Sequence, residues 1–257
     1  MQQRVSTNNN ISAVIIAFNE EKYIQQCIKS ILPVTTNIIV VDSGSTDNTV
    51  KLATEAGAEV HFMTWEGYGN NKNFGNSKAK YDWILSIDAD EMLDSKLQQH
   101  LLKLNKSTKT IYKIKSLVRY NGKWIKHCGW YPAWKLRFFH KSIYWNLDPV
   151  HETLIYPNNT NFEKLDGHLY HFSYDSIEQH RQKSAVYGKL KAESWIKKGE
   201  PIGIIKQLFG PTFKFLRTYI FKLGILDGRE GLIISRIDAE MIRIAIRYYK
   251  NLKGENL

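Results

Sequence analysis

The chain has 257 residues, 43% of them hydrophobic, which is enough to bury a sizeable core in one domain or in one domain with an appendage. Its two cysteines lie far apart, which argues against a disulfide framework or a zinc site. The net charge of +11 is uneven, because residues 1–100 carry 8 Lys and Arg against 12 Asp and Glu, whereas residues 101–257 carry 28 against 13. The resulting balances of −4 and +15 indicate an anionic partner for the second part, or only a solvated basic face.

We expect neither a targeting signal nor a membrane-spanning helix. No stretch approaches the roughly 18 uninterrupted apolar residues of a transmembrane helix. Residues 1–10 are polar and lack an apolar core, so we expect no signal peptide and take the cytoplasm as the expected compartment.

Apolar strands alternate with helices over residues 11–91. The expected strands are residues 11–18, 38–41, 59–63 and 83–87. Helices are expected near 23–31, from Ser45 or Thr46 as N-cap to Ala56, and over 70–79. This alternation predicts an α/β fold with a parallel sheet and right-handed crossovers. Ligands bind such sheets beyond the carboxyl ends of the strands.

Two acids, Asp88 and Asp90, follow the apolar strand 83–87 directly. On a continuing strand, side chains two residues apart share one face. Two carboxylates there suit a hard divalent cation that also binds phosphates. Taken alone, the pair also fits a strand followed by a helix-capping acidic turn.

Three motifs resemble, in order and spacing, those of inverting family 2 glycosyltransferases with a GT-A fold. They are Ala17-Phe-Asn-Glu-Glu21, Val40-Val-Asp-Ser-Gly-Ser-Thr-Asp47 and Ser86-Ile-Asp-Ala-Asp-Glu91. The resemblance is close to about residue 95 and looser to about residue 175. It implies a nucleotide-sugar donor and a divalent ion, Mg²⁺ or Mn²⁺, that neutralises the leaving diphosphate.

The resemblance also assigns roles by position. Asp42 would accept a hydrogen bond from the nucleotide base, and the corner Phe18-Asn19-Glu20 would contact base and ribose. Asp90 would coordinate the metal, while Asp88 would position the ribose or share the ion. Lys72 would touch the donor phosphate or base edge, or would be an exposed helix lysine.

Aromatic residues crowd between positions 124 and 145, where they either stack on sugar rings or build a core: Trp124, Trp130, Tyr131, Trp134, Tyr144 and Trp145. Between Trp134 and Tyr144, residues 135–141 resemble the family's strand toward the acceptor side, and Arg137 lies on this strand.

The segment Asp148-Pro-Val-His-Glu152 resembles the part of lipopolysaccharide-core members that supplies the catalytic base. An inverting transfer needs a carboxylate that takes the acceptor's proton opposite the leaving group. We therefore expect Glu152 to be the base, with Asp148 as the fallback, although the family more often has Glu-Asp here. His151 would orient Glu152 or approach the diphosphate.

Two histidines, His168 and His171, follow on a further expected strand. Being three apart, they should face opposite sides and not form a matched metal pair. His171 is the one expected to close over the diphosphate, unless both are structural.

From Ser176 onward the pattern is helical. Residues 202–223 mix apolar side chains with Lys206, Lys214, Arg217 and Lys222. Pro201, Gly210-Pro211 and Gly224 should break the segment into short helices. Such helices suit a bilayer interface or simply cap the catalytic core. Residues 224–231 also resemble the tail of lipopolysaccharide-core β-1,4-glucosyltransferases.

The expected architecture is a GT-A domain over residues 1–175, followed by a basic amphipathic helical tail over 176–257. Residues 1–95 form the nucleotide-sugar-binding half and residues 96–175 the acceptor half. The expected function is inverting transfer of a hexose, glucose from UDP-glucose, to a lipid-linked saccharide acceptor such as the lipopolysaccharide inner core. The enzyme would be peripheral to the anionic cytoplasmic surface of the inner membrane.

Two kinds of alternative stay open. One is transfer to another glycolipid, exopolysaccharide or capsule intermediate. The other is a non-catalytic binder of sugar nucleotides or of nucleic acid. A nucleic-acid binder would leave the acids at the strand ends unexplained and shows no recognised binding module, so we expect no nucleic-acid partner.

Overall fold

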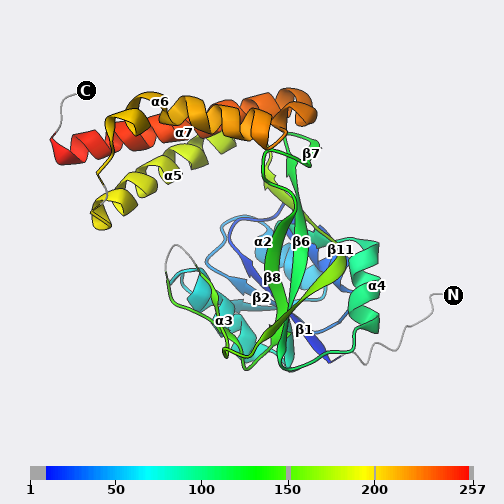
Figure 1. Cartoon of the computed structure of the whole chain (residues 1–257). Coiled ribbons are helices and arrows are strands. Elements are labelled where there is room, and N and C mark those ends of the chain that lie inside the picture. Colours follow the sequence, from blue (N-terminus) through cyan, green and yellow to red (C-terminus); the bar gives the residue numbers. More distant parts are fainter. Residues whose placement is uncertain (1–9, 149–151, 200, 255–257) are drawn as a thin grey trace. The chain divides into compact units, whose positions relative to one another are not determined.

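The computed structural model describes residues 10–148, 152–199 and 201–254 (Figure 1). The chain divides into two compact units. Unit 1 comprises Met1–Ser116 and Ala133–His171, and unit 2 comprises Leu117–Pro132 and Phe172–Leu257. The second crossing lies close to the expected boundary at residue 175, but unit 2 also takes in residues 117–132, which the sequence places in the acceptor half.

Unit 1 begins with alternating strands and helices, as the apolar periodicity predicts. They are β1 (Ile11–Ala17), α1 (Ile24–Ile31), β2 (Ile38–Asp42), α2 (Thr49–Glu55), β3 (Glu59–Phe62), α3 (Tyr68–Lys78) and β4 (Trp83–Asp88). The chain continues with β5 (Glu91–Leu93), α4 (Ser95–Lys103), β6 (Thr110–Tyr120), β7 (Lys123–Ile125), β8 (Ala133–His140), β9 (Tyr144–Trp145), β10 (Leu154–Ile155) and β11 (Asn161–Tyr174). Of these, β7 lies in unit 2, and β6 and β11 run from unit 1 into unit 2.

The main sheet has nine strands in the order β3-β2-β1-β4-β8-β6-β11-β5, with β7 paired to β6. The first four are parallel, as expected, whereas β8 pairs antiparallel with both β4 and β6. In register, Ala17 lies opposite Asp42 and Ile16 opposite Asp88. The acids that end β2 and β4 therefore meet the end of β1 at one edge of the sheet.

Alternate residues of the parallel strands build two cores on opposite faces. Ala13 and Ile15 of β1 belong to the larger core, which includes apolar residues of α1 and α4. Val14 and Ile16 belong to the other core, against which Phe74 of α3 packs. Trp145 also lies in this second core, so this aromatic residue builds packing rather than an open sugar platform.

Unit 2 contains three long helices, α5 (Ile177–Lys197), α6 (Ile204–Leu216) and α7 (Gly228–Lys253). A π-helical turn, η1 (Arg217–Phe221), and a 3-10 turn, η2 (Gly224–Asp227), join α6 to α7. Figure 1 shows α7 alongside both α5 and α6. Pro211 lies inside α6, so the expected helix break at Gly210-Pro211 was wrong, whereas the break at Gly224 is confirmed.

The segment 224–231 acts as a packing element of unit 2. A Cβ added to Gly231 would lie 1.8 Å from the carbonyl oxygen of Gly224, so only glycine permits this crossing. The buried Asp227 accepts hydrogen bonds from the N–H groups of Lys126 and His127, at 3.2 and 2.8 Å. These contacts join residues 117–132 to the helical region and explain why both belong to one unit.

The positive charge is concentrated in unit 2, although the two units differ less in charge than residues 1–100 and 101–257 do. Unit 2 carries 19 Lys and Arg against 9 Asp and Glu, a balance of +10, which leaves 17 against 16 in unit 1. Among the residues that the structure describes, no helix combines the length and apolarity needed to cross a bilayer.

Candidate active site

The turn after β2 holds the carboxylate of Asp42, which is 4% exposed. Its Oδ2 accepts hydrogen bonds from the N–H groups of Gly44 and Ser45, both at 2.9 Å. Its Oδ1 accepts one from Ser45 Oγ at 2.5 Å. Gly44 has a φ of +94°, which glycine adopts readily. A carboxylate has about four acceptor positions, so Asp42 keeps one for a ligand.

The same turn is fastened to the end of β1. Asn19 N–H donates to Ser45 Oγ at 2.9 Å, and Thr46 N–H donates to Asn19 Oδ1 at 2.8 Å. Glu20 N–H donates to Thr49 Oγ1 at 2.7 Å. The two loops that carry the first two motifs therefore form one corner.

This corner differs from the sequence expectation at the start of α2. Ser45 and Thr46 bond to Asp42 and Asn19, while α2 begins only at Thr49 and has no side-chain cap. The expectation that Ser45 or Thr46 caps this helix was wrong. Phe18, also in the corner, is 56% exposed and open to a ligand.

The third motif spans a strand end and a turn. β4 ends at Asp88, and Asp90 lies in the turn before β5, so the condition of a continuing strand, under which Asp88 and Asp90 would share one face, is not met. Asp88 Oδ2 accepts a hydrogen bond from Arg137 Nη2. Asp88 Oδ1 is buried and accepts no hydrogen bond from any described residue. Its charge partner at the sheet edge is Lys72, whose Nζ lies 3.5 Å away.

Arg137 of β8, which is 4% exposed, is the central cation of this network. Glu91, fully buried, places its Oε1 3.0 Å from Arg137 Nη2 and 2.8 Å from Lys135 Nζ. Glu91 Oε2 also accepts the N–H of Asp88 at 3.1 Å. The pairing of Arg137 and Lys135 with Glu91 is not among the roles predicted from the sequence. The signal for it is that Lys135 and Arg137 stand two apart on a strand, so their side chains share a face.

Charges decide the ionisation of this network. Burial by itself raises the pKa of both acids, but the Arg137 guanidinium outweighs it, helped by Lys135. The pKa of Asp88 therefore lies well below 3.8, with Lys72 contributing, and that of Glu91 falls from 4.5 to about 2. Burial lowers the pKa of Arg137, but Asp88 and Glu91 together raise it above its ordinary value. All three groups are ionised at neutral pH.

Asp90 pairs with a histidine from the far strand. Its Oδ2 lies 3.2 Å from His171 Nε2, and the two side chains are 21% and 17% exposed. β11 brings His171 there because it pairs with β5, with His171 opposite Glu91. His168 instead lies 3.0 Å from Asp94. The two histidines therefore contact different acids.

Lys72 is buried, at 1% exposed, and is not the exposed helix lysine that one interpretation allowed. Its Nζ lies 3.1 Å from Glu152 Oε1 and 3.5 Å from Asp88 Oδ1. The ammonium also lies 4.6 Å from the centre of the Trp145 ring, a cation–π distance. Lys72 therefore joins the proposed base to the acid at the end of β4.

Helix α3 holds the segment that leads to Glu152. Asn73 Nδ2 donates to the Trp145 carbonyl at 2.8 Å, and Trp145 N–H donates to Asn73 Oδ1 at 2.9 Å. A Cβ on Gly69 would lie 1.9 Å from the Asn146 carbonyl oxygen, so glycine allows the close approach. Asn146 in turn bonds Thr153 three times, at 2.8 to 3.0 Å.

The structure thus gathers the expected residues of unit 1 into three groups. Phe18, Asn19, Glu20 and Asp42 form the corner; Lys72, Asp88 and Glu152 form the linked group; Asp90 and His171 form the pair. Asp148 is exposed, and residues 149–151, including His151, lie outside the described residues. The role of His151 stays a prediction.

The donor set suits a divalent ion that a phosphate also binds. Asp90 and His171 offer an oxygen and a nitrogen close together, and Asp88 Oδ1, which accepts no hydrogen bond from the described residues, is a further oxygen. Within the described ranges, no group of three or more His, Cys, Asp or Glu side chains is placed to hold a metal ion. Taken together, the site has four carboxylates, Asp88, Asp90, Glu91 and Glu152, against three permanent cations, Lys72, Lys135 and Arg137. A diphosphate there would need added positive charge.

Comparison with known proteins identifies the family. Residues 12–158, more than half of the chain, match the family described as glycosyl transferase family 2. The chain belongs to glycosyl transferase family 2: it is a glycosyltransferase with a GT-A-like mixed sheet flanked by helices and followed by C-terminal helices.

Two relatives align with this chain over most of their own length. An uncharacterized glycosyltransferase of Rickettsia typhi is 31% identical, over 96% of this chain and 89% of that protein. The lipopolysaccharide core biosynthesis glycosyltransferase LpsC of Rhizobium meliloti is 32% identical, over 87% of this chain and 85% of that protein.

Among solved structures, glucosyl-3-phosphoglycerate synthase from Mycobacterium tuberculosis, in complex with Mn²⁺, UDP and phosphoglyceric acid, is 30% identical with a TM-score of 0.36. The match covers 42% of this chain and 43% of that one. That score is too low to transfer anything from that enzyme to this chain.

Proposed function

We propose that this glycosyltransferase transfers a hexose, glucose from UDP-glucose, with inversion to a lipid-linked saccharide such as the lipopolysaccharide inner core. The core-biosynthesis relative and the resemblance of residues 224–231 to core glucosyltransferases support the acceptor and donor. The observation that carries the proposal is the link through Lys72 between Asp88, on the donor side, and Glu152.

Each group then has a chemical task. The Asp42 turn and the Phe18–Glu20 corner bind the nucleoside, with the remaining acceptor position of Asp42 available to the base. Glu152 takes the proton of the acceptor hydroxyl as that oxygen bonds to the anomeric carbon and the bond to the diphosphate breaks. Lys72, 3.1 Å away, holds the Glu152 carboxylate in place.

Asp90 and His171 would hold the divalent ion, with Asp88 near it. When bound, Mg²⁺ or Mn²⁺ supplies positive charge for the leaving diphosphate. The diphosphate needs this positive charge because the site has four carboxylates against three permanent cations, and the excess negative charge would repel it.

A lipid-linked acceptor is met at a membrane surface. Unit 2 supports this with its balance of +10 and with apolar side chains of α6 that are exposed. We therefore place the enzyme, as a peripheral protein, at the anionic cytoplasmic face of the inner membrane.

The test is a screen of donor hydrolysis and transfer over several UDP- and GDP-sugars, with Mg²⁺ and with Mn²⁺. Glu152→Gln keeps the shape of the side chain but removes the proton acceptor. It should slow transfer by about 10²–10⁴-fold, without loss of UDP affinity. Asp148→Asn is the matched control and should retain turnover. Normal turnover in Glu152→Gln together with a dead Asp148→Asn would move the base to Asp148.

A further inference from the structure

Helix α6 carries a ridge of apolar side chains that are exposed to solvent. Its members are more than 60% exposed, which is unusual for side chains of this size: Ile204, Ile205, Leu208, Phe209 and Phe213. Their spacing of one, three and four residues places them along one side of the helix. Phe221 of η1, at 75% exposed, adds a further ring beyond the end of α6. A ridge of this kind marks a surface for an apolar partner.

Beside the ridge, within unit 2, is a hollow of about 290 Å³ among α5, α6 and α7. Among the described residues, four cationic and two aromatic side chains line it and no acid does: Lys191, Trp195, Lys206, Phe213, Lys214 and Arg217. Phe213 belongs both to the ridge and to the hollow. The hollow therefore lies at the border of the apolar surface.

The cations of the hollow are held in position. Lys206 Nζ lies 4.1 Å from the centre of the Trp195 ring, and Lys191 Nζ lies 5.5 Å from it. Lys214 Nζ pairs with Asp238 at 2.9 Å. The four cationic side chains that line the hollow suit an anion.

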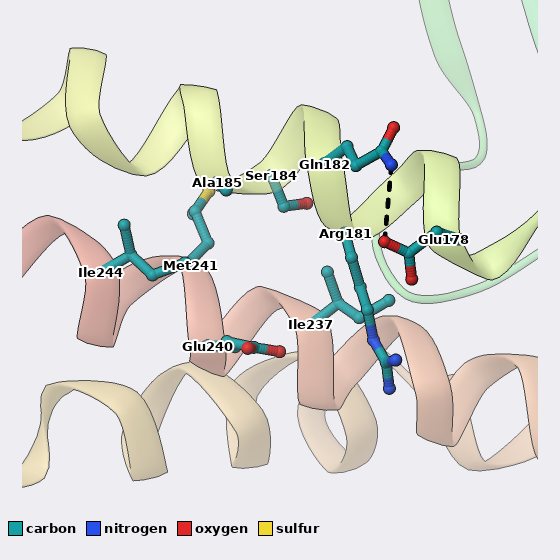
Figure 2. A pocket seen from close by; sticks show the side chains of 9 residues that line it. All are labelled: Glu178, Arg181, Gln182, Ser184, Ala185, Ile237, Glu240, Met241 and Ile244. Carbon is teal, nitrogen blue, oxygen red and sulfur yellow. Dashed lines mark hydrogen bonds between the residues drawn. The ribbon is translucent and has the colours of Figure 1, made fainter.

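A second hollow of the same unit has a different character. Figure 2 shows it between α5 and α7, with Glu178, Arg181 and Glu240 among its lining and Ile237 between the two helices. It combines acids with a cation, so it lacks the single sign of charge found beside the ridge. The cationic hollow is thus a local feature and not a general property of the helical layer.

We infer that the hollow binds the phosphate of an anionic lipid headgroup, while the ridge of α6 enters the boundary between headgroups and acyl chains. Charge complementarity and the position of Phe213 select a bilayer lipid as the occupant. The inference deepens the proposed function and rests on it for the placement at a membrane. It adds a defined headgroup site to a surface that otherwise would attract lipids only through its overall charge.

The experiment is flotation of the full chain with vesicles of phosphatidylglycerol in phosphatidylcholine, compared with phosphatidylcholine alone. Lys206→Ala/Arg217→Ala removes two cations from the hollow. Arg243→Ala/Arg247→Ala, on the exposed side of α7, removes the same charge outside it. The hollow variant should lose about tenfold to thirtyfold in affinity for the anionic vesicles, and the control less than about threefold.

Three results would overturn the inference. Equal losses in both double variants would mean that diffuse charge, not the hollow, attracts the surface. Displacement from vesicles by inorganic phosphate at constant ionic strength would mean that the hollow takes a free anion. Failure of the wild-type chain to float with anionic vesicles would remove the site altogether. Donor hydrolysis by the same preparations separates this inference from the proposed function, because hydrolysis fails only if the latter is wrong.

Discussion

His180 gives the most direct test of the physical reasoning in unit 2. It is 3% exposed, and its Nδ1 lies 3.1 Å from Tyr120 Oη. The rings of Tyr120, Trp130 and Tyr174 surround it at centroid distances of 5.2, 5.6 and 4.7 Å. Burial lowers the pKa of His180 from 6.5 to about 4, against an opposing effect of Asp238.

The sign of the pH effect follows from proton binding. Below pH 6.5 the unfolded chain takes up a proton at this histidine, whereas the folded unit takes it up only near pH 4. The stability that comes from the neutral imidazole is therefore present above pH 6.5 and is lost as the pH falls toward 4. At about 1.4 kcal/mol per pKa unit, the loss amounts to about 3 kcal/mol.

His180→Gln removes this titration while keeping a group that hydrogen-bonds. Over the range from pH 6.5 to 4, the free energy of unfolding of the wild type should fall by about 3 kcal/mol more than that of the variant. Urea unfolding followed by tryptophan fluorescence measures it, because Trp130 lies against His180. Tyr120→Phe is the control: it removes the hydrogen-bond partner but not the burial, so its pH dependence should persist. Parallel pH profiles of wild type and His180→Gln would mean that burial does not lower the pKa of His180 in the folded protein.

Three predictions concern the candidate site. Asp90→Ala should abolish transfer without unfolding the protein, and EDTA should do the same; full activity in EDTA would contradict the metal assignment. Asp42→Ala should weaken UDP binding by roughly 1–3 kcal/mol, measured by calorimetry, because a base hydrogen bond is lost; unchanged affinity would contradict the role. Lys72→Met should lower turnover by about 10- to 100-fold, because Glu152 loses its anchor, whereas Lys72→Arg should recover part of it; normal turnover in Lys72→Met would separate Lys72 from the base.

The first half of the fold follows from local patterns. The strands β1, β2 and β4 are short apolar runs bounded by turns, and Ala13, Ile15, Val14 and Ile16 of β1 fill both faces of the sheet, so the sequence alone indicates buried parallel strands. The division into units does not follow in this way. Residues 117–132 join the helices through contacts such as Asp227 with His127, which lie 100 positions apart and leave no periodic signal.

The candidate site likewise has residues that the sequence alone indicates and residues that it does not. Acids that end strands are visible in the sequence because an apolar run stops at them, as at Asp42 and Asp88. The burial of Lys72 is not visible, because the buried residues of α3 are small or polar, namely Gly69, Asn71, Lys72 and Gly75. A helix that packs through such residues has no apolar stripe. The contacts of α3 depend instead on Gly69, because the absence of a Cβ there permits the close approach to Asn146.

The distribution of charge between the units implies that the two anions of the proposed reaction are bound in different ways. Unit 1 is nearly neutral, with 17 Lys and Arg against 16 Asp and Glu, and the cations of its candidate site, Lys72, Lys135 and Arg137, are already paired with acids. The donor diphosphate would therefore depend on a divalent ion, whereas lipid phosphates would meet the surplus cations of unit 2. Monovalent salt screens exposed charges far more than buried pairs or a metal–phosphate bond. Raising the salt should thus release the enzyme from anionic vesicles while UDP binding with Mg²⁺, followed by calorimetry, changes little. A parallel fall of both affinities would mean that the diphosphate, too, is held mainly by exposed cations.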